Sequence, residues 1–271
     1  MKADFHMHTW FSTDSESDPE DMIKHALKIG LDTICFTDHF DKDYPRRNES
    51  GEIEFQLDID SYLKTMSALK NKYAKWIDVR IGVEIGLQPH LGKFYKEFVN
   101  AQPLDFVIGS VHVVEHQDPY YGAFFEGKTD EIAYRETFEE MLVDIKNNQD
   151  FDVLGHIDYI VRYGKTKAAN YSYKKYSDIL DEILKYLIEN GKGIELNTAG
   201  YKYGLGFCHP HPDMIKRYHE LGGEIITIGS DGHKPEHMAY DFGKVSDILK
   251  ACGFKVYTEF KDRKPYFRQL P

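Results

Sequence analysis

The sequence predicts one α/β domain built on a parallel sheet, either open or closed into a barrel. Short apolar runs alternate with amphipathic stretches about seven times along the chain, as strands alternate with crossover helices in such sheets. The length of 271 residues is close to that at which α/β barrels fold as a single domain. No segment rich in Pro, Gly or Ser divides the chain, so we expect residues 1–271 to form one domain.

The first helix and the strand after it can be predicted in detail. Asp18 supplies a capping carboxylate, Pro19 suits the first helical position, and Gly30 suits the C-terminal cap. Apolar residues between them recur at helical spacing, which predicts a helix over 19–29. The run 33–36 that follows is short, apolar and bounded by polar residues, as is typical of a buried strand.

The remaining elements repeat this alternation. The predicted strands lie near residues 2–6, 33–36, 79–84, 106–111, 152–155, 193–196 and 225–229. The predicted helices after the first one cover residues 62–74, 129–147, 177–190 and 212–221. The polar segment 41–54 matches neither pattern, and we expect it to be a loop near the face where the strands end.

Charge and cysteine content exclude several classes of protein. The formal net charge is −11 and the pI is about 5.6, so the chain lacks the general basic character of a nucleic-acid or anionic-membrane binder. Its three cysteines are odd in number and far apart, which argues against a disulfide framework. The first residues lack the apolar run of a signal peptide, and no later stretch resembles a transmembrane span. We therefore expect a soluble, cytoplasmic protein.

Side chains able to bind a metal follow nearly every predicted strand. In chain order they are His6 and His8, Asp38 and His39, Glu84, His112, His156, and Asp231 with His233. In a parallel α/β barrel the carboxyl ends of the strands meet at one face, so these residues are expected to converge on a small volume. The pair His6 and His8 is weak support by itself, because 13 histidines make such a pair common by chance.

Other histidines fall outside the strand ends. We interpret His209 and His211, which lie in a segment punctuated by proline, as loop residues rather than metal ligands. Surface positions are expected for the histidines within predicted helices or loops, namely His25, His90, His116, His219 and His237.

The predicted ligand set suits a site with several metal ions. Imidazole and carboxylate donors without thiolate fit zinc, manganese or iron and do not single one out. These donors exceed the three protein ligands that one catalytic zinc usually takes. Glu84, a lone carboxylate on the middle strand, can bridge two ions through its two oxygens. Paired ions generate hydroxide at neutral pH and clamp phosphoryl oxygens, so phosphoester hydrolysis is the expected chemistry.

The chain resembles the PHP family, named for its polymerase and histidinol phosphatase members. The resemblance covers nearly the full chain in family order, with the motifs Asp4-Phe5-His6-Met7-His8, Asp14, Thr37-Asp38-His39, Gly82-Val83-Glu84, Gly109-Ser110-Val111-His112, Gly155-His156 and Gly229-Ser230-Asp231-Gly232-His233. It implies a distorted (β/α)7 TIM-like barrel and a site for three divalent ions. The implied ligands are His6, His8, Glu84 and Asp231 for the first ion, Glu84, His112 and His156 for the second, and Asp14, His39 and His233 for the third.

Within that family, the segments 155–162 and 195–206 resemble the histidinol-phosphatase branch, whose members hydrolyse L-histidinol phosphate in histidine biosynthesis. The resemblance makes Arg162 a phosphate ligand, with a surface arginine as the alternative. Lys202 stands where relatives often carry arginine, and a lysine can bind phosphate but not as a bidentate fork. In the expected mechanism a metal-bridging hydroxide attacks phosphorus, and Asp231 or His233 protonates the leaving oxygen.

Three alternatives stay open on the sequence alone. A PHP phosphoesterase can instead act on another small phosphate ester or on a nucleotide. An amidohydrolase barrel usually needs a carboxylated lysine at its fourth strand, and the run 108–112 contains none. A non-catalytic metal-binding barrel tends to lose ligands, whereas all nine positions are filled here. Candidate acids for the cationic amine of histidinol phosphate are Glu115, Glu126 and Asp158.

Overall fold

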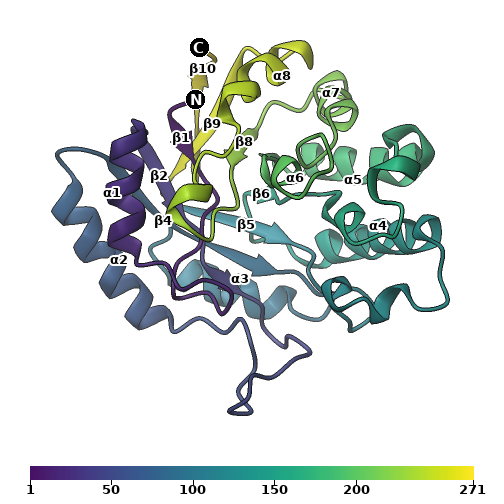
Figure 1. Ribbon diagram of the computed structural model, residues 1–271, viewed down its shortest axis with the longest axis horizontal. Helices are drawn as coiled ribbons and strands as arrows, with labels where there is room; N and C mark the ends of the chain where they lie inside the picture. The colour runs from purple at the N-terminus through teal and green to yellow at the C-terminus, as the bar shows by residue number, and fades with distance from the viewer.

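Seven parallel strands form a nearly closed barrel surrounded by helices in the computed structural model, which describes residues 1–271 (Figure 1). Neighbours around the barrel follow the order β1-β2-β4-β5-β6-β7-β8, and the short β3 pairs with β4 beyond the end of β2. The seven barrel strands are β1 (Ala3–Asp4), β2 (Thr33–Phe36), β4 (Asp78–Gly86), β5 (Phe106–Ser110), β6 (Val153–Leu154), β7 (Gly193–Asn197) and β8 (Ile226–Gly229), and the eighth strand of the sheet is β3 (His39–Phe40). All seven predicted strands are therefore confirmed.

The barrel closes where the chain leaves β1 beside β8. The amide of Phe5 donates to the carbonyl of Ile228 at 2.8 Å, and the amide of His8 donates to the carbonyl of Gly232 at 2.9 Å. Met7 and Gly232 also form an isolated parallel bridge. Of the two arrangements that the sequence allows, the closed barrel is thus the correct one, and it brings the first and last strand ends together.

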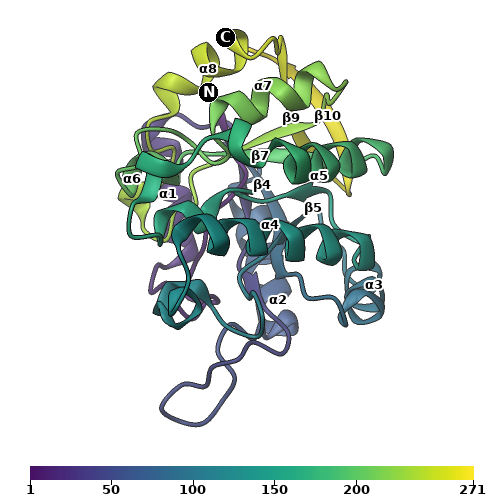
Figure 2. The same ribbon diagram turned by 90° about the vertical axis from the view of Figure 1, so that its right-hand side faces the viewer.

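Helices cover the outside of the barrel (Figures 1 and 2). They are α1 (Pro19–Ile29), α2 (Ile59–Tyr73), α3 (Gly92–Ala101), α4 (Asp130–Asn147), α5 (Ser177–Glu189), α6 (Ala199–Lys202), α7 (Pro212–Glu220) and α8 (Val245–Ala251). The details predicted for α1 are confirmed, because the Asp18 carboxylate accepts from the amide of Glu20 at 2.7 Å and Gly30 adopts a left-handed φ of 79°.

Some elements lack a readable signal in the sequence. Helix α3 begins after Leu91, which supplies no side-chain cap, and α8 is only seven residues long. The antiparallel hairpin of β9 (Val256–Lys261) and β10 (Lys264–Gln269) follows the barrel, and β10 is exposed along its whole length. Without a buried face, β10 shows no alternation of apolar and polar residues, so the sequence does not predict it.

The hairpin covers the amino-terminal ends of β5 and β6. Arg263, at its turn, donates from Nε to the Asp152 carboxylate at 2.6 Å and from its amide to the carbonyl of Asp105 at 3.0 Å. The Phe260 ring lies 5.0 Å from the Phe106 ring inside the barrel. One continuous core of 69 buried residues, which includes Phe260, joins barrel, helices and hairpin. This continuity makes the chain a single α/β domain.

The two ends of the molecule differ in character. Segment 41–58, which contains the predicted loop 41–54, links β3 to α2 and extends away from the barrel at the lower edge of Figure 1. Both termini lie at the opposite edge in Figures 1 and 2.

All three cysteines are free and buried. None of the helices is both long and apolar enough to cross a membrane.

The hairpin provides a test of how the barrel is stabilised. Replacing Phe260, which is 3% exposed, with alanine is expected to lower the free energy of unfolding by about 3–5 kcal/mol, because it opens a cavity against Phe106. Phe267→Ala on the same hairpin is the control, since Phe267 is 50% exposed and should cost less than about 0.5 kcal/mol. Chemical unfolding measures both values, and equal losses would contradict this account of the hairpin.

A buried carboxyl on α4 predicts a pH dependence of stability. Neither oxygen of Asp144 has a hydrogen-bond partner, and burial, helped by the charge of Glu140, raises the pKa of Asp144 to about 9. An unfolded aspartate titrates near pH 3.9, so between these values the folded state holds a proton that the unfolded state has lost. The contribution of Asp144 should therefore fall with rising pH, by up to about 1.4 kcal/mol per pH unit. Unfolding of wild type and Asp144→Asn across pH 5–8 measures this difference, which parallel curves would refute.

Candidate metal centre

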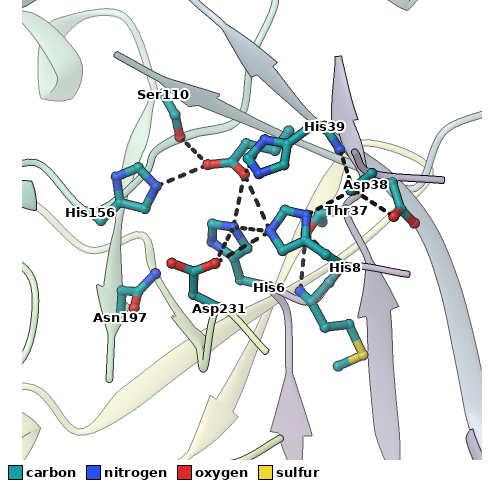
Figure 3. Close-up of polar contacts among 12 residues, drawn as sticks. His6, His8, Thr37, Asp38, His39, Ser110, His156, Asn197 and Asp231 are labelled. Carbon is teal, nitrogen blue, oxygen red and sulfur yellow. Dashed lines mark hydrogen bonds and ion pairs between the residues drawn. The ribbon is translucent and has the colours of Figure 1, made fainter. Parts of the chain in front are cut away.

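A buried carboxylate, that of Glu84 on β4, lies at the centre of the strand ends. Figure 3 shows residues of this region, among them His6, His39, His156 and Asp231. Glu84 Oε1 accepts a hydrogen bond from Ser110 Oγ at 2.6 Å and lies 3.0 Å from His156 Nε2 and 3.3 Å from His112 Nε2. Because these partners come from the ends of β5 and β6, three neighbouring strands supply one side of the site.

The other oxygen of Glu84 faces residues from the beginning of the chain. Oε2 lies 3.1 Å from His6 Nε2, 3.4 Å from His8 Nε2 and 3.2 Å from His39 Nδ1. Asp231, after β8, places Oδ1 3.4 Å from His8 Nε2. Asp231 also holds a left-handed backbone with φ of 52°, which is uncommon outside glycine and clusters at functional sites.

A third carboxylate, that of Asp14, joins Glu84 and Asp231 from the loop after β1. Asp14 Oδ2 lies 2.9 Å from His233 Nε2 and 3.8 Å from His39 Nε2. The structure thus brings all nine predicted ligands to one end of the barrel. We call them the ligand cluster: His6, His8, Asp14, His39, Glu84, His112, His156, Asp231 and His233.

Hydrogen bonds to the far side of the rings fix the tautomers of the ligand cluster. His6 Nδ1 lies 2.6 Å from a carboxylate oxygen of Glu195, and this contact makes Nδ1 the protonated nitrogen. Ser12 Oγ donates to Asp38 at 2.7 Å, so its contact with His8 Nδ1 at 3.2 Å requires His8 to be the donor. When the two rings are neutral, both Nε2 atoms therefore direct lone pairs inward, and they lie only 3.1 Å apart.

His112 is oriented in the same way, because its Nδ1 lies 2.7 Å from the Asp41 carboxylate while its Nε2 faces Glu84. Inward-facing lone pairs beside an anionic oxygen repel one another unless protons on the rings or bound cations supply positive charge between them. Carboxylates and carbonyls behind metal-ligating histidines are the usual second layer of a metal site. The donor set therefore fits bound divalent cations, and four groups of three ligand atoms within 4.8 Å of one another offer places for them.

The pKa values within the ligand cluster show the same demand for positive charge. Burial lowers the pKa of His6, but the carboxylates of Glu195 and Glu84 outweigh it and raise that pKa well above its ordinary value. His8 has its pKa lowered by burial and by the nearby His233. Burial would raise the pKa of Glu84, yet the surrounding histidines hold it well below its usual range. Glu84 is thus an anion at neutral pH.

A cavity of about 450 Å³ opens above the ligand cluster. Aromatic rings make up much of its wall: Tyr44, Phe55, Tyr120, Tyr121, Tyr159, Tyr163 and Tyr203. The two predicted phosphate ligands also line it. The Arg162 guanidinium lies 4.4 Å from the Tyr159 ring and 4.3 Å from the Tyr203 ring, and its buried Nε has no hydrogen-bond partner. Lys202 Nζ donates to the carbonyl of Asp231 at 3.2 Å, and burial lowers its pKa.

Several expectations about individual residues differ from the structure. Glu115, Glu126 and Asp158 do not line the cavity, where Asp118 and Glu54 stand instead. His237, expected at the surface, lines the cavity because the 3-10 helix η6 (Pro235–His237) folds back toward the ligand cluster. His209 and His211 lie outside the ligand cluster, as expected; His209 is buried against Asp158, and His211 caps α7.

Two acidic residues that contact the outer nitrogens of the ligand cluster are not predicted from the sequence. Asp41 and Glu195 orient His112 and His6, and both are buried. A usable signal exists for Glu195, because it is a charged residue inside the apolar run of β7. Asp41 carries no such signal, because it stands in a polar loop that holds many acids.

Comparisons with known proteins agree with this geometry. The PHP domain family matches residues 4–199. A probable histidinol-phosphatase of Clostridium acetobutylicum is 33% identical over 94% of this chain and 95% of its own, and the histidinol-phosphatase of Lactococcus lactis is 30% identical over 97% and 96%. The crystal structure of the Lactococcus lactis histidinol phosphate phosphatase with zinc, L-histidinol and phosphate superposes with a TM-score of 0.89, at 31% identity over 98% of both chains.

The contact between Glu195 and His6 is expected to strengthen metal binding. Glu195→Gln removes the charge that fixes the His6 tautomer, so zinc affinity should fall about 10–100-fold. Competition with a chelator of known affinity measures the change. The control is Glu189→Gln at the exposed end of α5, which should leave zinc affinity unaltered. Equal zinc affinity in wild type and Glu195→Gln would rule out this role for Glu195.

Proposed function

The chain belongs to the PHP domain family, and from that membership we propose that it hydrolyses L-histidinol phosphate to L-histidinol and inorganic phosphate, a step of histidine biosynthesis. One observation carries the proposal: a guanidinium with an unpartnered Nε, that of Arg162, shares the cavity with the ligand cluster. Likeness over nearly the full length to histidinol-phosphatases supports this substrate. Under the proposal, residues 1–271 form one metal-dependent phosphoesterase domain.

The proposed metal content is three divalent ions, with zinc favoured over manganese or iron by the zinc in the Lactococcus lactis structure. When bound, such ions would supply a nucleophile at neutral pH and neutralise phosphoryl oxygens. We assign the ligands as the family resemblance implies: His6, His8, Glu84 and Asp231; Glu84, His112 and His156; and Asp14, His39 and His233. Glu84, with one oxygen toward each side of the ligand cluster, is the shared ligand.

Arg162 and Lys202 are proposed to hold the phosphoryl group. The planar guanidinium offers parallel N–H groups that match two phosphoryl oxygens, and its stacking against Tyr159 and Tyr203 restricts its orientation. Lys202 adds a point charge on the side of Asp231. Both cations line the cavity, where they can stabilise the charge of a phosphoryl transition state.

The remaining groups of the cavity serve the leaving alcohol. Asp231 and His233 border both the ligand cluster and the cavity, so we assign the proton for the leaving oxygen to one of these two. The aromatic rings and the carboxylates of Asp118 and Glu54 give the cavity apolar faces and negative charge. An imidazole ring and a cationic amine, the two features of histidinol, match these surroundings.

The proposed substrate is tested by phosphate release from a panel of small phosphate monoesters and nucleotides. L-Histidinol phosphate is expected to give the highest kcat/KM. Metal analysis of the same active protein should find more than one ion per chain. A higher kcat/KM for another ester would replace the substrate, and fewer than two ions per active chain would refute the multinuclear site.

His156 tests the site itself. His156→Asn withdraws the imidazole that faces Glu84 Oε1, so phosphatase activity should fall by more than about 100-fold while the circular dichroism spectrum stays unchanged. His90→Asn, which replaces an exposed histidine outside the cavity, is the matched control and should keep wild-type turnover. Full turnover by His156→Asn would refute the assignment of this residue to the metal site.

A further inference from the structure

A buried contact between Asp158 and His209 lies behind the cavity wall and has no part in the function described so far. The two side chains are 0% and 1% exposed, and Asp158 Oδ1 lies 2.5 Å from His209 Nδ1. Asp158 Oδ2 accepts from the amide of His211 at 2.8 Å. One short segment, 209–211, thus satisfies both oxygens of a carboxylate that burial would otherwise penalise.

Asp158 immediately precedes the short helix that carries Arg162, the proposed phosphate ligand. Its carbonyl accepts from the amide of Val161 at 3.0 Å and so starts the 3-10 helix η3 (Tyr159–Arg162). Arg162 is the last residue of η3; its guanidinium stacks on aromatic rings, and its Nε donates no hydrogen bond. Stacking fixes the plane of a guanidinium but makes no directional hydrogen bond within that plane, so the position of Arg162 depends on how η3, which begins after Asp158, is held.

The segment that holds Asp158 is itself fixed to the barrel. The amide of His209 donates to the carbonyl of Asn197 at 2.8 Å, and the amide of Asn197 donates back at 2.6 Å. The side chain of Asn197 donates to Glu195 Oε2 at 3.1 Å, and the other oxygen of Glu195 contacts His6. His209 therefore connects η3 to the end of β7, and Glu195 on the same strand orients His6 of the ligand cluster.

We propose that His209, acting through Asp158, is a positioning residue that holds Arg162 in the orientation needed to receive phosphoryl oxygens. This inference rests on the proposed phosphatase function. The donor is Nδ1 alone, because His209 Nε2 is buried without a partner. Removal of that donor leaves Asp158 Oδ1 unpaired and frees the start of η3, which costs phosphate binding because a bidentate fork tolerates little displacement.

Two substitutions at position 209 separate the hydrogen bond from bulk. His209→Leu replaces the imidazole with an apolar side chain of similar length and so removes the hydrogen-bond donor. His209→Asn instead places an amide N–H near the position of Nδ1. In His209→Leu the KM for the phosphate monoester and the inhibition constant of inorganic phosphate should each rise about tenfold, with a smaller change in kcat. His209→Asn should restore both constants toward wild type, and zinc content should not change in either variant.

Coupling to Arg162 distinguishes positioning from general loss of stability. In an Arg162→Ala background, His209→Leu should have little further effect on the inhibition constant of phosphate, because the side chain it positions is gone. If His209→Leu does not fold at the assay temperature, His209→Gln, whose amide lies one bond farther out, takes its place. An unchanged inhibition constant in the single variant, or fully additive losses in the double variant, would overturn the positioning role. Wild-type protein inactive on every phosphate ester would instead refute the proposed function.

Discussion

Electrostatic repulsion between the Glu84 carboxylate and the imidazole lone pairs that face it is the constraint on which the rest of the site depends. The Glu84 carboxylate, buried near the end of β4, is surrounded by imidazole nitrogens from the beginning and the middle of the chain. In three of these imidazoles Nδ1 is fixed as a hydrogen-bond donor. Such an arrangement is unfavourable without positive charge between the donors. Barrel closure between β1 and β8 supplies the rigidity that keeps these groups together despite their repulsion.

Local patterns explain how much of this could be predicted from the sequence. The strands could be located because each is a short apolar run, and the residues of the ligand cluster could be located because they follow those runs directly. Asp14 is the exception, since it stands in a loop and only the family resemblance pointed to it. Asp41 was not predictable, because the contact that buries it joins two loops 71 residues apart in the chain. Hairpin β9–β10 was missed because β10 has no buried face.

The distribution of charge in the cavity explains how an acidic chain can receive an anion. The net charge of −11 counts every acid of the chain, including Glu84 and Asp231, whose buried carboxylates lie among histidines that hold their pKa values low. With divalent ions bound there, and with Arg162 and Lys202 in the wall, the cavity would be positive although the protein is negative. The carboxylates thus serve to concentrate cations at the one place where a phosphate must bind.

Both chain termini lie at the edge of the molecule opposite the segment 41–58, which borders the cavity with Glu54 and Phe55 (Figure 1). The last residue, Pro271, is held by hydrogen bonds from Ser246 and Lys250 at the end of the molecule away from the ligand cluster. A purification tag or a surface linker attached at either terminus is therefore directed away from the cavity. Immobilised through its terminus on a resin or sensor chip, the protein would present its open cavity to the solution.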